Sequence, residues 1–213
     1  MENLLSDLID SLTDQHDKFF GVVVGTVIDP VDPLLLGRVQ VQLPFIDSLD
    51  LSPWARVATP MAGPAHGMYF IPNPGDEVLV AFENGDVNVP YIIGSLWNTQ
   101  SPPPLPSPLA QIRMIRTLAG NTITFTEAPP TITVTAAGGQ TIELSPAGIQ
   151  IVAGASVVSL TPDGVTITGL NVNLVGTAAV NITAPNVTIN GDAAANVQSA
   201  GICNVTAPLV KIN

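Results

Sequence analysis

Positive charge is scarce in this 213-residue sequence, which contains six Lys and Arg against 17 Asp and Glu. Only 11% of its residues carry a charged side chain, and the formal net charge is −11 at pH 7. A surface with this balance repels the phosphate backbone of nucleic acids and the headgroups of anionic lipids. We therefore expect no nucleic-acid partner.

Cysteine and long apolar runs are also rare or missing. The single cysteine, Cys203, cannot form a disulfide within the chain, so stability must come from packing or assembly. No apolar run reaches 18 residues, and the first ten residues, M-E-N-L-L-S-D-L-I-D, are acidic where a signal peptide is basic. We expect a protein that is made without an ordinary signal peptide.

Groups of residues that work together in catalysis are not evident either. The sequence shows no paired carboxylates, no nucleophile elbow and no constellation of metal ligands. His66 in G-P-A-H-G is open to two interpretations, as a ligand or base, or as an exposed histidine in a loop. We expect no enzymatic activity, no cofactor and no metal.

Residues 1–18 have the pattern of a short amphipathic helix. Apolar residues recur at helical spacing, with acidic residues between them. The apolar positions are Leu4, Leu5, Leu8, Ile9 and Leu12. There are two interpretations of this segment. It is a helix that packs on its own domain, or it docks to a partner and folds when it docks.

Residues 19–98 contain short β-rich runs separated by Pro, Gly and Asp turns. The runs are G-V-V-V-G-T-V-I, G-R-V-Q-V-Q-L, W-A-R-V-A-T, E-V-L-V-A-F and Y-I-I-G-S-L-W. Nine of the ten aromatic residues lie in or beside this stretch, and large side chains suit a compact core. Five strands in about 80 residues predict a small barrel of the oligonucleotide/oligosaccharide-binding (OB) type. The Pro-rich stretch within 99–112 then favours an extended linker and a domain boundary.

Residues 113–213 repeat an apolar-polar-apolar triplet about every eight residues. Such a repeat allows a strand of about five residues and a turn of three, with one apolar face. One such strand buries two side chains, too little to offset the ordering of its backbone at roughly 1–2 kcal/mol per residue. We therefore predict an all-β chain whose second part is a triangular β-helix, in which three chains wind about one axis. The predicted axis residues are Ile132, Val134, Ile142, Leu144, Ile149, Ile151, Val158, Leu160, Val165, Ile167, Val172, Leu174, Val180, Ile182, Val187, Ile189, Cys203, Val205, Val210 and Ile212.

Two shorter features have alternative interpretations. Cys203 takes an inward position of the repeat, as a small buried hydrophobe or as one of three thiolates that meet at a metal on the axis. The acidic loop I-D-P-V-D-P, Ile28 to Pro33, is either a calcium site or a pair of proline-rigid turns between strands.

Two parts of the sequence carry a family resemblance. The run G-R-V-Q-V-Q-L-P, with W-A-R-V-A-T-P and G-D-E-V-L-V-A-F-E-N-G-D after it, resembles the OB domain of phage baseplate assembly protein V and of the VgrG spike of type VI secretion. The stretch from Arg113 to Glu127, R-M-I-R-T-L-A-G-N-T-I-T-F-T-E, resembles the join between that domain and the β-helical spike. The resemblance implies the central baseplate spike of a phage tail, tailocin or type VI-like machine, which punctures the target cell envelope mechanically.

The resemblance also implies a location and partners. The expected particle is a homotrimer assembled in the bacterial cytoplasm as part of a virion baseplate or injection system, with transient contact to the target membrane. A separate hub protein is expected to contact the apolar positions of residues 1–18. A PAAR-like tip protein is expected on Val210, Lys211, Ile212 and Asn213, where the apolar repeat is still in phase.

Two other function classes remain open at this point. A trimeric receptor-binding fibre or adhesin is also built from β-helical repeats. An OB-fold ligand-binding module would need cationic residues and exposed aromatics, and residues 19–98 contain only two cationic residues, Arg38 and Arg56.

Overall fold

The computed structural model describes residues 18–45, 52–104 and 111–211. Every helix or strand assigned in these residues is a β-strand. The chain divides into two compact units, one up to Gln111 and one from Ile112 onwards. None of the described residues forms a helix long and apolar enough to cross a membrane. The helix predicted over residues 1–18 falls almost entirely outside the described residues.

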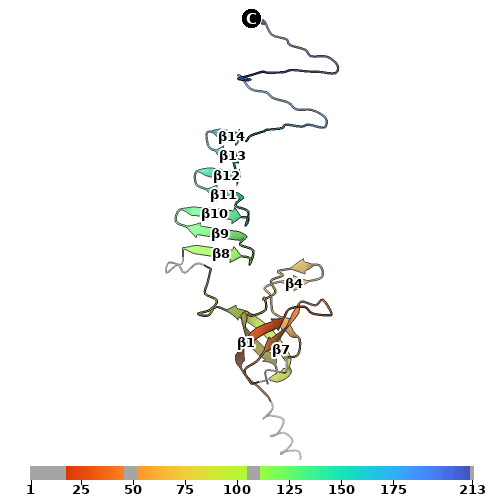
Figure 1. Ribbon diagram of the computed structural model, residues 1–213, viewed down its shortest axis with the longest axis vertical. Helices are drawn as coiled ribbons and strands as arrows, with labels where there is room; N and C mark the ends of the chain where they lie inside the picture. The colour runs from red at the N-terminus through yellow and green to blue at the C-terminus, as the bar shows by residue number, and fades with distance from the viewer. Residues whose placement is uncertain (1–17, 46–51, 105–110, 212–213) are drawn as a thin grey trace, which may run out of the picture. The chain divides into compact units, whose positions relative to one another are not determined.

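The first unit contains a closed five-stranded barrel (Figure 1). Its strands pair in the order β1-β2-β3-β7-β6, and all neighbours are antiparallel except β3 and β7, which are parallel. The strands are β1 (Val22–Asp29), β2 (Arg38–Gln42), β3 (Ala55–Val57), β6 (Glu77–Glu83) and β7 (Asp86–Leu96). The five-stranded barrel predicted from the β-rich runs is confirmed.

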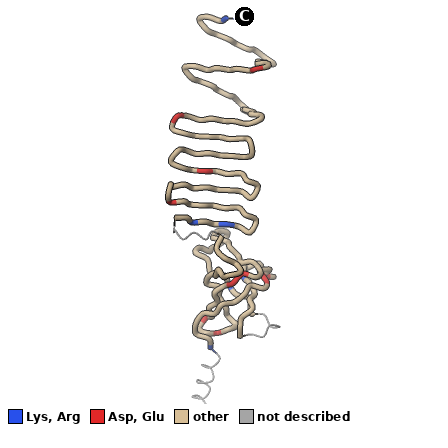
Figure 2. Tube along the Cα trace, turned by 60° about the vertical axis from the view of Figure 1, so that its left-hand side comes forward, with Lys and Arg blue, Asp and Glu red and all other residues tan. Residues whose placement is uncertain are grey.

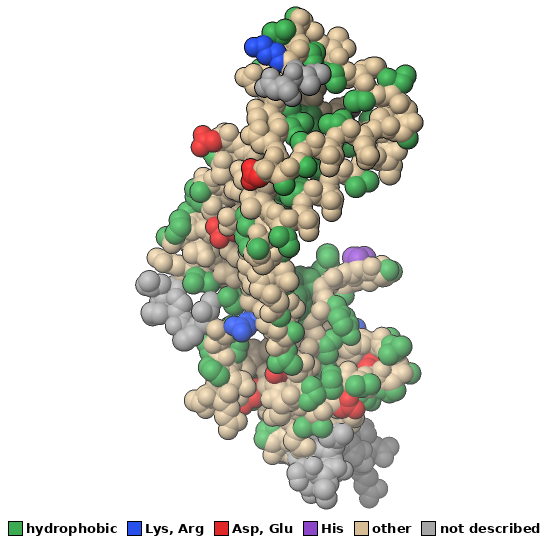
Figure 3. Space-filling view, turned by 45° about the horizontal axis from the view of Figure 1, so that its top comes forward, with side chains coloured by type: hydrophobic (Ala, Val, Ile, Leu, Met, Phe, Trp, Pro, Cys, Tyr) green, Lys and Arg blue, Asp and Glu red, His purple; other side chains and the backbone are tan. Residues whose placement is uncertain are grey.

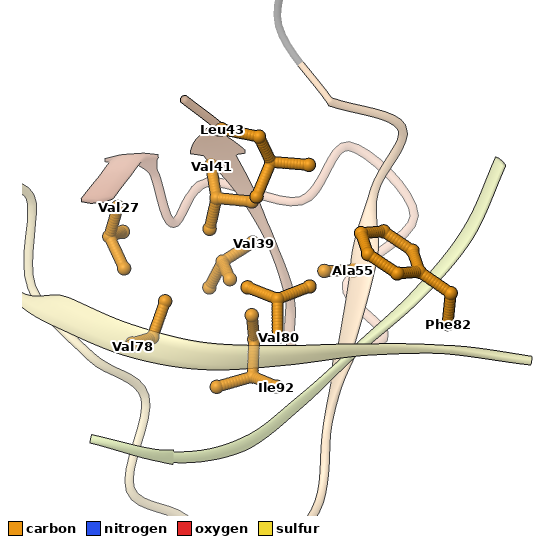
Figure 4. Close-up of a cluster of buried hydrophobic side chains, with 9 residues drawn as sticks. All are labelled: Val27, Val39, Val41, Leu43, Ala55, Val78, Val80, Phe82 and Ile92. Carbon is orange, nitrogen blue, oxygen red and sulfur yellow. The ribbon is translucent and has the colours of Figure 1, made fainter. Parts of the chain in front are cut away.

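Alternate residues of the barrel strands form its core. In β2 and β6 every second side chain is buried, as expected for strands with one face inward. Figure 4 shows this core, which consists of Val27, Val39, Val41, Leu43, Ala55, Val78, Val80, Phe82 and Ile92. Asn84 and Gly85 close the tight turn from β6 to β7 with positive φ values of 50° and 79°, which Asn-Gly pairs adopt readily.

A small two-stranded arm follows β3. It consists of β4 (Ala62–Gly63) and β5 (His66–Gly67), which pair in antiparallel fashion. Thr59 Oγ1 donates a hydrogen bond of 2.7 Å to the Met68 carbonyl at its base. The arm therefore has its own sheet beside the barrel strands.

The second unit contains a seven-stranded antiparallel meander (Figures 1 and 2). Each strand pairs with the next one along the chain. The strands are β8 (Ile112–Arg116), β9 (Thr122–Glu127), β10 (Pro130–Thr135), β11 (Thr141–Ser145), β12 (Gly148–Ala153), β13 (Ser156–Thr161) and β14 (Gly164–Thr168). Their lengths of five and six residues match the repeat in the sequence.

The pairing of these strands differs from the predicted winding. We predicted three chains that wind about one axis, whereas over residues 112–168 the strands pair with one another within one chain. The reason lies in the turns: two residues, such as Gly154 and Ala155, reverse the chain, and Gly154 takes a φ of 60° that suits glycine. The backbone groups of each strand are therefore satisfied by the chain's own next strand.

The described residues from Gly169 to Lys211 form no strand, although the apolar repeat continues through them. Figure 2 shows this segment as an open coil, in contrast to the closely stacked passes of β8–β14. Over this part the chain makes no backbone ladder with itself, so nothing in the structure contradicts winding about other chains there.

Candidate assembly surface

The register of β8–β14 places the predicted axis residues of these strands on one face of the sheet. Residues directly opposite each other in an antiparallel pair point to the same face. Ile132 lies opposite both Phe125 and Leu144, and Val134 lies opposite both Ile123 and Ile142. Two apolar columns result. They are Phe125, Ile132, Leu144, Ile149, Leu160 and Val165, and Ile115, Ile123, Val134, Ile142, Ile151, Val158 and Ile167.

The described residues leave these columns uncovered. Ile142 is 41% exposed and Ile151 is 42% exposed, although both lie in the middle of a paired strand. Figure 3 shows hydrophobic side chains at the molecular surface. A contiguous apolar face of this kind marks a surface for another macromolecule. We call it the apolar face.

The opposite face of the same sheet is polar. Thr133 lies opposite Thr124 and Glu143, and Glu143 lies opposite Gln150. Threonine fits a pleated surface and presents a hydroxyl to water. The sheet therefore has one side for burial and one for solvent, as the alternation of its sequence indicates.

The apolar face carries an ion pair at one end, which the sequence reasoning missed. Arg113 lies opposite Phe125, and Glu127 follows Phe125 by two residues, so both side chains lie on the apolar face. The Arg113 guanidinium donates a hydrogen bond to the Glu127 carboxylate. The signal in the sequence was the position of both charges in phase with the apolar repeat.

The predicted axis residues beyond Gly169 lie outside the sheet. Val172, Leu174, Val180, Ile182, Val187, Ile189, Cys203, Val205 and Val210 are exposed in residues without strands. Cys203 belongs to no group of three metal-ligating side chains among the described residues. Of the predicted tip contacts, Val210 and Lys211 are described, whereas Ile212 and Asn213 are not; the predicted hub contacts Leu4, Leu5, Leu8, Ile9 and Leu12 also lie outside the described residues.

The acidic loop before β2 is built around a buried carboxylate. Asp32 is 4% exposed, and Arg38 donates to it twice, from Nε at 2.9 Å and from Nη2 at 2.7 Å. The backbone N–H groups of Leu34 and Leu36 donate to it at 3.0 Å. Hydrogen bonding from Arg38, helped by these N–H groups, holds the pKa of Asp32 well below its usual range. Asp32 is thus satisfied by the protein, and the structure favours the turn interpretation over a calcium site.

The two arginines of the barrel are both engaged by neighbours. Besides its pair with Asp32, Arg38 lies over the Trp54 ring at 5.8 Å from the centroid. Arg56 lies over the Tyr91 ring at 5.5 Å, and its Nη1 donates to the Tyr91 hydroxyl at 3.5 Å. Tyr91 donates to Glu83, and this hydrogen bond raises the pKa of Tyr91. The barrel therefore holds these cations in intramolecular contacts rather than in a groove for a polyanion.

The comparisons with known proteins agree with this barrel geometry. Residues 23–97 match the family model of the type VI secretion system/phage-baseplate injector OB domain. Residues 23–97 are therefore similar to an injector OB domain.

Curated relatives share this part of the chain. The chain is 33% identical over 96 residues to the type VI secretion system spike protein VgrG3 of Vibrio cholerae, which covers 41% of this chain and 9% of that protein. It is 34% identical over 99 residues to the spike protein VgrG5 of Pseudomonas aeruginosa, which covers 44% of this chain and 12% of that protein. A third relative, 32% identical over 96 residues, is the actin cross-linking toxin VgrG1 of Vibrio cholerae, with 41% of this chain and 9% of that protein covered. The matched segment spans about a tenth of these relatives' own length.

The first unit has a hollow of about 510 Å³ beside the β4–β5 arm. Its lining is mainly apolar and includes Leu36, Val57, Met61, Tyr69 and Phe70. His66 also lines it, and its Nδ1 lies 3.0 Å from the Pro64 carbonyl within the exposed arm. None of the described residues that line it is an Asp, Glu or Cys.

Proposed function

We propose that this chain acts as the central baseplate spike of a contractile injection machine, as a homotrimer that punctures the target cell envelope. The observation that carries the proposal is the apolar face of β8–β14 on a chain whose other unit matches the injector OB-domain family over residues 23–97. An exposed apolar face is stabilised when another surface covers it. Three copies of this chain about a threefold axis cover the apolar faces of one another.

Three copies of the sheet close a triangular prism when their apolar faces point inward. Over residues 112–168 each chain then forms one whole side of the prism. From Gly169 onwards, where the chain does not pair with itself, the three chains wind around each other and pair between chains. The remaining axis residues, from Val172 to Ile212, fill this second part. The polar side, with Thr124 and Thr133, faces water.

The function that follows is mechanical. A narrow shaft concentrates the force of contraction, and a polar outer surface avoids lasting adhesion to lipid. In this proposal residues 1–18 dock on a separate hub protein through Leu4, Leu5, Leu8, Ile9 and Leu12. Residues Val210, Lys211, Ile212 and Asn213 contact a PAAR-like tip protein, and the spike touches the target membrane only during delivery.

Sedimentation equilibrium of the full chain tests the assembly. One chain has a mass of 22.1 kDa, so a homotrimer has 3 × 22.1 = 66.3 kDa. The proposal expects the larger mass at micromolar concentration. A folded monomer of 22.1 kDa would contradict it.

Labelling of the particle tests the function. An antibody against the OB domain, applied to injection particles from the producing cells, is expected to bind at the baseplate on the tail axis. Deletion of the gene is expected to abolish delivery to target cells. Label on fibres at the periphery would support the receptor-binding alternative instead.

A further inference from the structure

The Arg113–Glu127 pair is a conspicuous polar interruption of the apolar face. In the described strands β8–β14 the other positions of this face are Ile, Val, Leu, Phe, Pro and Ala, together with one uncharged hydroxyl residue, Ser156 opposite Ala153. The two side chains are 65% and 57% exposed in the single chain. An exposed ion pair of this kind contributes little to stability. In a closed prism, however, the pair is enclosed with the rest of the face.

The apolar columns by themselves do little to fix the axial position of one chain relative to another. Each strand presents two branched or aromatic side chains at nearly the same spacing as the next strand. If one chain slides along another by two strands, Ile142 takes the place of Val158, and apolar contacts replace apolar contacts. Uniform strands of this kind specify register weakly. A further feature is needed to keep three chains level.

We propose that the Arg113–Glu127 pair sets the axial register of three copies of this chain. The inference rests on the proposed trimer and adds to it the residues that align the chains. At equal height, three guanidinium and three carboxylate groups meet in one neutral layer. After a slip of two strands, the pair of one chain keeps its internal contact but lies against apolar side chains such as Ile132 of another chain, and loses water and the polar groups of the other two chains.

The physical basis is the difference between matched and unmatched burial of charge. A buried ion pair adds little net stability over apolar residues of similar size, yet an enclosed charge without polar neighbours is strongly destabilising. Because Arg113 and Glu127 pair within one chain, assembly in register buries no bare charge. Single polar residues in apolar seams fix register in coiled coils by the same effect.

Cysteine crosslinking of the full-length chain tests this register. Chains with Ile142→Cys and chains with Val158→Cys, both in a Cys203→Ala background, are unfolded together, reassembled and oxidised. These positions lie two strands apart in one column. Chains in register form disulfides between like positions, whereas slipped chains form disulfides between positions 142 and 158. The readout is the ratio of mixed to like disulfides on a non-reducing gel.

The decisive variant is Arg113→Met with Glu127→Leu, which is expected to raise this ratio on the order of tenfold while the trimer persists. Its matched control is Arg116→Met with Glu143→Leu. Arg116 lies opposite Thr122 and Glu143 opposite Thr133, so both point to the polar face. The control is expected to leave the ratio unchanged.

Equal ratios in the decisive variant and the control would overturn the inference. If the apolar variant does not fold, the charge-swapped variant Arg113→Glu with Glu127→Arg provides a second test. It keeps the ion pair, so its disulfide ratio is expected to equal that of the parent. A ratio raised as much by the swap as by the apolar pair would also overturn it. A parent chain that sediments at 22.1 kDa would instead refute the proposed trimer, so the two failures are distinguishable.

Discussion

The barrel and the meander use the same side chains in opposite ways. In the barrel, Val39, Val80 and Ile92 are at most 2% exposed, because the sheet closes on itself. In the meander, Ile132, Ile142 and Ile151 are about 40% exposed, because the sheet is open and the described residues do not cover this face. Apolar alternation thus identifies a face for burial, but it does not say whether the cover comes from the same chain.

The barrel buries its apolar side chains within its own sheet, whereas the meander needs another surface to cover its apolar side chains. The barrel has nine buried apolar residues in one cluster, so it has a core of its own. The meander has none of the chain's fully buried apolar residues among those described. We therefore expect the barrel to stay folded under changes that separate the meanders of different chains.

The largest effect is expected from Ile142→Asp on the apolar face. Three unpaired carboxylates at one level of the axis cost several kcal/mol each to bury. Sedimentation equilibrium should show a fall from 66.3 kDa, which is three times the chain mass, to the 22.1 kDa of one chain. The barrel should keep its near-ultraviolet circular dichroism. Thr133→Asp on the polar face is the control and should leave the mass unchanged; an unchanged mass for Ile142→Asp would remove the basis of the comparison.

The substitution Leu43→Ala in the barrel core is expected to lower the stability of the barrel, in contrast to Ile142→Asp, which is expected to leave the barrel folded. Leu43 is 1% exposed, so its removal leaves a cavity and costs about 2–5 kcal/mol of barrel stability. Denaturant unfolding followed by tryptophan fluorescence measures it, since Trp54 and Trp97 lie in the first unit. Leu35→Ala, at a position 90% exposed, should change stability by less than about 0.5 kcal/mol. Equal effects of the two would show that the barrel core is not as enclosed as the structure has it.

The Asp32 carboxylate should make barrel stability depend on acid pH. Its pKa is lowered in the folded state from the ordinary value of 3.8, so its contribution is fully present above that value and is lost as the pH falls below it. Asp32→Asn should lower the melting temperature at pH 7 and flatten its fall between pH 4 and pH 2. Thermal unfolding across this range measures both. If the melting temperatures of parent and variant fall in parallel as the pH is lowered, the acid sensitivity comes from other carboxylates.

The smallest effect is expected from Arg56→Met. Arg56 contacts Tyr91 on the exposed surface of the barrel, in contrast to Arg38, whose partner Asp32 is buried. Exposed pairs contribute little, so barrel stability should change by less than about 0.5 kcal/mol. Affinity for a single-stranded oligonucleotide, measured by fluorescence anisotropy at physiological salt, should be negligible before and after the change. Micromolar affinity that this variant removes would favour the OB ligand-binding alternative.

Much of the fold follows from the sequence because its patterns are strict. The run E-V-L-V-A-F predicted β6, and the run Y-I-I-G-S-L-W predicted the second half of β7. The triplets with Ile132 and Val134 or Ile142 and Leu144 predicted the strands of the meander and their shared face. Local patterns of this kind depend only on neighbours along the chain.

The pairing of the repeats was not predictable in the same way. A triplet followed by a short turn fits a hairpin within one chain as well as a corner between chains, so residues 112–168 and 169–211 have similar patterns and different structures. The side-chain partnerships were missed for a related reason. Arg38 reaches Asp32 through loop geometry that the sequence alone does not show. Arg113 and Glu127 are in phase with the apolar repeat, but their contact also needs the pairing of β8 with β9.

The stacking of β8–β14 gives the meander different responses to pushing and pulling. Its backbone hydrogen bonds run from strand to strand, along the direction in which the seven strands are stacked (Figure 1). Compression presses each strand onto the next over a stack of about 29 Å, from six spacings of about 4.8 Å. Tension instead opens one hairpin at a time, because consecutive strands are joined end to end by short turns. Compression along the stack therefore loads all strand pairs together, whereas tension separates the pairs one after another.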